Sequence, residues 1–180
     1  MIFKYFFEKL NEPDNKIHDF FVLVKETLSE EFDKFITCIF KEGKPDILDS
    51  PGFSQKVQIA SYIRTNLKRI LDEGGEQIWT KPANSTYLLK IVPVNEFTEY
   101  RSSGGLNYVS CLIKFSPYSA AAIVLDHLTT LFSDRDLAKS LLPILMTPDD
   151  SGLTFLDYSF HRRIPQIINL VESEIGRAHV

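Results

Sequence analysis

Apolar residues recur at spacings of three and four along most of this chain, and that spacing restricts the fold more than any other feature. Residues 14–40 show this spacing most clearly. The apolar residues that follow it are Ile17, Phe20, Phe21, Val24, Leu28, Phe32, Phe35, Ile36 and Ile39. Such spacing places one apolar stripe along a helix. Asp14 after Pro13 supplies a start, and Gly43 with Pro45 supplies a stop. We predict one long helix, or two with a slight break, whose phenylalanine-rich face is buried.

The pattern continues over residues 53–73, where Gly74 and Gly75 mark the end of a second predicted helix. The next stretch is ambiguous. Its segment STYLLKIVPV is rich in β-branched and aromatic residues, but Pro93 restricts it to an edge strand or a short helix end. We therefore leave room for one short strand or hairpin near residues 77–94.

A flexible joint, RSSGG at residues 101–105, precedes a second helical region. Prolines divide this region into five predicted short helices, at residues 107–115, 117–132, 134–146, 153–160 and 164–172. Pro117 and Pro165 fall in first turns, where a proline is tolerated because that N–H has no helical partner. The fold class is mainly α, with a helical N-terminal region at residues 1–100 and a second helical segment at residues 105–173.

Residues 149–171, DDSGLTFLDYSFHRRIPQIINLV, carry a turn, a short helix and a second helix with paired branched residues. Gly152 permits the turn, and the Thr154 hydroxyl is placed to cap the first helix. This stretch resembles an ankyrin repeat, although Phe155 occupies the place where that family has proline. The resemblance implies an antiparallel helical hairpin whose branched residues face a neighbouring repeat, and a function in binding other proteins.

A weaker copy of this pattern lies upstream, GLNYVSCLIKFSPYSAAAIVLDHL, beginning at Gly105. Asn107 stands there in the place of the threonine. The two glycines, Gly105 and Gly152, are 47 positions apart, whereas ankyrin repeats are spaced by roughly 33 residues. We expect the excess to hold an extra helix, DRDLAKSLLPILM, between two degenerate ankyrin-like hairpins.

The last residues, EIGRAHV at 174–180, look like neither a helix nor a linker. They resemble one reading frame of a short-read sequencing adapter. Segments of foreign origin are excluded from fold reasoning. We therefore expect residues 174–180 to be a non-native tail, and the native chain to continue past Ser173.

Composition excludes some classes of function but does not identify one. Hydrophobic residues make up 44% of the chain and charged residues 24%, with a net charge of −4. These values are ordinary for a globular protein and give no basic field for nucleic acid. The N-terminal segment lacks the features of a signal peptide, and no window is apolar enough to span a membrane. The expected location is intracellular, and cytoplasmic by default.

Reactive residues are few and scattered. His18, His127 and His161 lie far apart, with no second ligand at metal-binding spacing. Cys38 and Cys111 lie inside apolar runs, so buried free thiols are expected, and one disulfide between them stays open. No metal-protease, thiol-redox, nucleophile-elbow or phosphate-loop motif is present. No catalytic residue, metal ligand or cofactor is assigned.

The basic tripeptide His161–Arg162–Arg163 lies between the last two predicted helices. In ankyrin-like proteins such tips lie near the surface that binds partners, so these three residues are the predicted contact site. The predicted function is a protein–protein interaction module, part of a longer intracellular protein, with no nucleic-acid or membrane partner. Two alternatives stay open: an enzyme fragment whose catalytic residues lie outside the given sequence, and a structural helical domain of a larger assembly.

Overall fold

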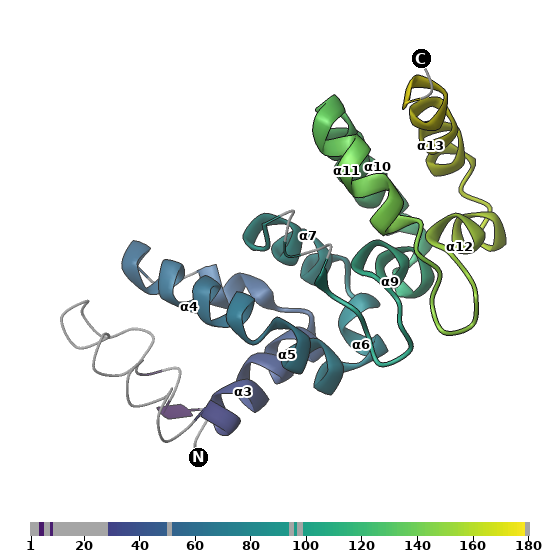
Figure 1. The fold of residues 1–180 in the computed structure, drawn as a ribbon. Coiled ribbons are helices and arrows are strands. Elements are labelled where there is room, and N and C mark those ends of the chain that lie inside the picture. The colour runs from purple at the N-terminus through teal and green to yellow at the C-terminus, as the bar shows by residue number, and fades with distance from the viewer. Residues whose placement is uncertain are drawn as a thin grey trace. The chain divides into compact units, whose positions relative to one another are not determined.

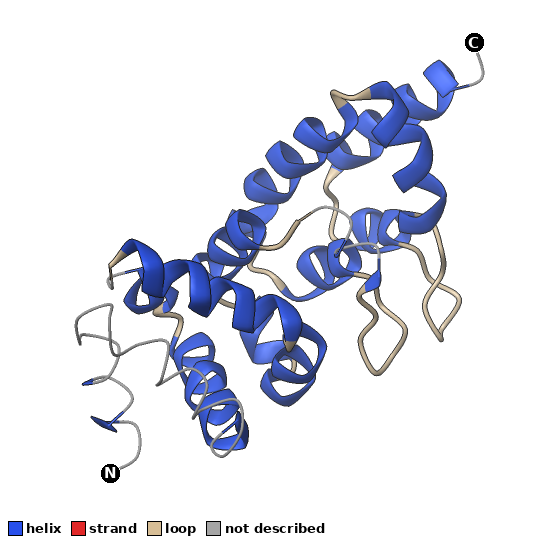
Figure 2. Cartoon of the chain, turned by 60° about the vertical axis from the view of Figure 1, so that its left-hand side comes forward, coloured by secondary structure: helices blue, strands red, loops and turns tan. Residues whose placement is uncertain are grey.

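A computed structural model describes Lys4, Tyr5 and Glu8, residues 29–49 and 52–93, Glu96, and residues 99–178. Within these ranges the regular elements are helices, without a strand (Figure 2). The predicted mainly α fold is therefore confirmed. The chain divides into two compact units, Met1–Ile78 and Trp79–Val180. This division falls earlier than the joint that the sequence suggests near residues 101–105.

The described helices of the first unit follow one another with short links. They are α3 (Ser29–Glu42), the 3₁₀ helix η2 (Pro45–Asp49), α4 (Phe53–Thr65) and α5 (Leu67–Gly74). Helix α6 (Glu76–Trp79) follows, and its last residue, Trp79, is the first of the second unit. Helix α3 packs mainly on α5. Phe32 and Phe35 are 0% and 1% exposed, which confirms that the phenylalanine-rich face of α3 is buried. Residues 14–28 of the predicted long helix, including Phe20, lie outside the described residues.

The helix predicted for residues 53–73 is two helices, because the chain turns at Asn66. The backbone of Asn66 has φ −109° and ψ 16°, and its side-chain amide donates to the Tyr62 carbonyl at 2.9 Å. Asparagine side chains compete in this way for backbone groups and interrupt helices. Apolar spacing continues across the break, so periodicity alone does not reveal it. Gly75, with φ +60°, closes α5 as predicted.

A buried carboxylate joins α3, α4 and α5 of this unit. Asp33 on α3 is 1% exposed. Its Oδ1 accepts a hydrogen bond from the Tyr62 hydroxyl at 2.8 Å, and its Oδ2 pairs with Arg69 Nη2 at 2.5 Å. Burial, followed by the bond to Asp33, raises the pKa of Tyr62 well above its usual value. The Arg69 guanidinium compensates the charge that would otherwise be costly to bury.

The second unit contains the remaining regular elements of the described residues. They are α7 (Pro82–Ile91), α9 (Tyr108–Phe115), η3 (Tyr118–Ala120), α10 (Ala121–Phe132), α11 (Arg135–Leu145), α12 (Phe155–His161) and α13 (Pro165–Ala178). The five short helices predicted from the sequence all form. Their starts agree within two residues, apart from the 3₁₀ turn that precedes α10.

The possible strand near residues 77–94 is not formed, because α6 and α7 occupy this stretch. Pro82 takes the first position of α7, where its ring suits the helix. Asn84, Tyr87 and Leu88, spaced by three and four, are all buried. Packing of this face outweighs the strand preference of the β-branched and aromatic residues. Pro93 follows the end of the helix, as is common after a helix C-terminus.

The helices of the second unit form two stacked pairs, α9 with α10 and α12 with α13. The first helices of the pairs pack on each other, α9 against α12, and so do the second helices, α10 against α13 (Figure 1). Helix α10 also contacts α7 and α11. Fully buried side chains fill these contacts, including Leu112, Leu128, Phe155 and Ile167. The extra helix α11 therefore lies on α10, between the two pairs in sequence.

The expectation that the last residues are not helical is wrong, because α13 continues through Ser173 to Ala178. Glutamate, isoleucine, arginine and alanine all tolerate a helix well. An ion pair three residues apart, between Arg177 Nη1 and Glu174 Oε1 at 2.7 Å, supports the last turn.

Candidate interaction surface

A turn with a left-handed glycine precedes the first helix of each pair. Gly105 precedes α9 with φ +78°, and Gly152 precedes α12 with φ +79°. The Asp150 N–H donates to the Gly104 carbonyl at 3.1 Å, which joins one turn to the other. A Cβ on Gly105 would lie 2.6 Å from Asp150 Oδ1. Both the left-handed backbone and the close approach therefore require glycine at position 105.

A polar cap starts the first helix of each pair. The Asn107 side chain accepts from the Ser110 N–H at 2.8 Å at the start of α9. At the start of α12, Asp157 Oδ2 accepts from the Thr154 N–H at 2.7 Å, and the Thr154 hydroxyl accepts from the Asp157 N–H at 3.4 Å. The capping role expected of Thr154 is present, and asparagine serves the same purpose in the other pair.

A hydrogen-bonded cluster fixes the turn before α12. Asp149 is 8% exposed and accepts from the Tyr158 hydroxyl and from the N–H groups of Ser151 and Leu153, at 2.8 and 3.0 Å. Burial opposes ionisation, but these bonds and the charge of Lys114 outweigh it and lower the pKa of Asp149. Burial and then Asp149 raise the pKa of Tyr158 to about 12. Lys114 Nζ lies 5.0 Å from the centre of the Tyr158 ring.

Of the three predicted contact residues, Arg162 uses its side chain to bind backbone carbonyls of the chain itself. Its Nη1 donates to the carbonyl oxygens of Ile113 at 2.9 Å, Lys114 at 3.2 Å and Ser116. Carbonyls at a helix C-terminus lack helical donors and attract positive charge. Arg162 therefore caps α9 and joins the link inside one helix pair to the link inside the other.

The remaining predicted contact residues, His161 and Arg163, are exposed. Two large apolar side chains are exposed at the same links, namely Tyr118 and Phe160, each 61% exposed. The sequence analysis did not single out these two aromatic residues, which are flanked by Pro117 and Ser119 and by Ser159 and His161.

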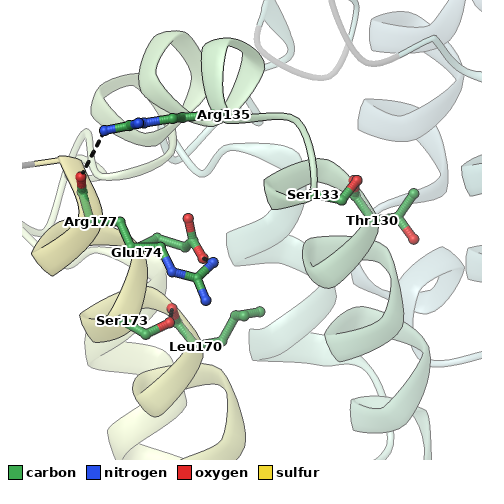
Figure 3. Close-up of polar contacts among 7 residues, drawn as sticks. All are labelled: Thr130, Ser133, Arg135, Leu170, Ser173, Glu174 and Arg177. Atoms are coloured by element: carbon green, nitrogen blue, oxygen red, sulfur yellow. Dashed lines mark hydrogen bonds and ion pairs between the residues drawn. The ribbon is translucent and has the colours of Figure 1, made fainter.

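A groove of about 630 Å³ lies between α11 and the end of α13. It is lined by Phe132, Ser133, Arg135, Ala138, Lys139, Leu142, Pro143, Ser173, Glu174, Gly176 and Arg177. Figure 3 shows Arg135 reaching across it, where Nη2 donates to the Arg177 carbonyl at 3.4 Å. The hydroxyls of Ser133 and Ser173 are turned back onto carbonyls of their own helices. Part of the wall belongs to residues 174–178, which the sequence predicts to be non-native, so we assign the groove no function.

The described histidine, cysteine and acidic residues do not gather into a metal-binding group. No cluster of three or more histidine, cysteine and acidic residues suited to a metal occurs among them. Burial lowers the pKa of His127 to about 4, against the opposing charge of Asp126. Cys38 and Cys111 are free thiols; Cys111 is buried as expected, but Cys38 is exposed. Phe35, Ile36, Ile39 and Phe40 face the core, and Cys38 lies on the other side of α3.

Within the described ranges, no helix combines the length and the apolar character needed to cross a bilayer. Comparison of the chain with protein families, curated proteins and solved structures found no match to any of them.

Proposed function

We propose that the second unit is a protein–protein interaction module built from degenerate ankyrin-like helix pairs. The single observation that carries this proposal is the way the two pairs stack, with α9 on α12, α10 on α13, and one glycine turn bonded to the other. Proteins built from stacked helix pairs use the surface along the stack to bind other proteins. An intracellular, cytoplasmic location belongs to the same proposal.

The polar features of the second unit also suit a binding scaffold. Arg162, Asn107 and Asp149 each use their side chains to hold backbone groups of the chain in place. These hydrogen bonds restrain the links and turns, and they leave the three side chains engaged with the backbone. A rigid stack with exposed residues at its links loses little conformational freedom when a partner binds.

Selection of displayed random peptides on the immobilised full chain tests the proposal. We expect selected peptides, once synthesised, to bind in a saturable way with one peptide per chain. Backbone amide signals that shift on binding should fall within residues 79–180. Failure to obtain any peptide that binds, or shifts confined to residues 29–78, would contradict an interaction role for the second unit.

A further inference from the structure

We draw no further inference here: the strongest candidate, the groove of about 630 Å³ between α11 and the end of α13, takes part of its wall from residues 174–178, which the sequence predicts to be non-native, and nothing in the structure shows what covers its apolar side.

Discussion

Replacement of Arg162 by methionine should destabilise the second unit. Methionine keeps an unbranched apolar stem of similar length, so the change removes mainly the guanidinium. The variant leaves the carbonyls of Ile113, Lys114 and Ser116 without the donor that they share. Because these carbonyls end α9, the loss affects the contact of α9 with α12 and the junction between the two helix pairs.

The size of the effect follows from the geometry. One guanidinium nitrogen contacts all three carbonyls but carries two protons, so two of the contacts can be full hydrogen bonds. A hydrogen bond to a charged group contributes about 1.5–3 kcal/mol when measured alone. Solvent reaches part of Arg162, and water replaces some of the lost bonding in the variant. We therefore expect the free energy of unfolding to fall by roughly 2–3 kcal/mol.

The fluorescence of Trp79 provides the assay, because the chain contains one tryptophan and it lies in the second unit. Trp79 is 2% exposed and packs edge-on against Tyr108, with ring centroids 5.1 Å apart. Urea unfolding followed by this signal should show a lower midpoint for Arg162→Met. Arg162→Lys should fall between the variant and the wild type, because an ammonium lacks the planar donor geometry. A loss below about 0.5 kcal/mol for Arg162→Met would refute the capping role.

Three further predictions concern other parts of the chain. Phe32→Ala should cost roughly 3–5 kcal/mol of stability, because Phe32 is fully buried, and a urea melt followed by circular dichroism that shows no loss would remove α3 from the core. Arg163→Gly should leave stability unchanged or raise it by up to about 1 kcal/mol, since relief of the left-handed backbone offsets the entropy of glycine; a clear loss in the Trp79 assay would contradict this. Asp149→Asn should reduce stability at neutral pH and narrow its difference from the wild type in acid. The folded-state pKa of Asp149 is lowered, so its contribution is present above the ordinary value of 3.8 and is lost as the pH falls further; equal stability of both proteins at neutral pH would refute it.

The sequence predicts the helices of the second unit well, because start signals and prolines coincide with the apolar spacing. Thr154 and Asn107 cap helices where the pattern places them, and Pro165 begins α13. The first unit shows where this reasoning fails. The break at Asn66 leaves the apolar spacing intact, and only the side-chain bond to Tyr62 reveals the turn. The sequence leaves a strand or a helix end open near residues 77–94, and α7 forms because burial of one face decides its structure more strongly than intrinsic preference.

Only the structure distinguishes the roles of the three residues in the predicted contact site. His161, Arg162 and Arg163 read alike in the sequence, as three basic residues in a link. Their roles differ because Arg162 faces the end of α9, which lies 46 to 49 positions earlier in the chain. Contacts over such separations leave no local pattern. The left-handed backbone of Arg163 was equally hidden, since glycine or asparagine is the usual sign of that conformation.

The placement of α11 has a consequence for how the second unit folds. Gly105 and Gly152 are 47 positions apart, compared with roughly 33 between equivalent positions of successive ankyrin repeats. The entropy of closing a chain loop grows only with the logarithm of its length, so the added residues raise the cost of bringing the two turns together by about 0.3 kcal/mol. The hydrogen bond between Asp150 and Gly104 alone is of comparable or greater worth. An insertion at this point is therefore almost free in chain entropy, and lengthening or shortening the link around α11 should change the folding rate far less than any change to the glycine turns.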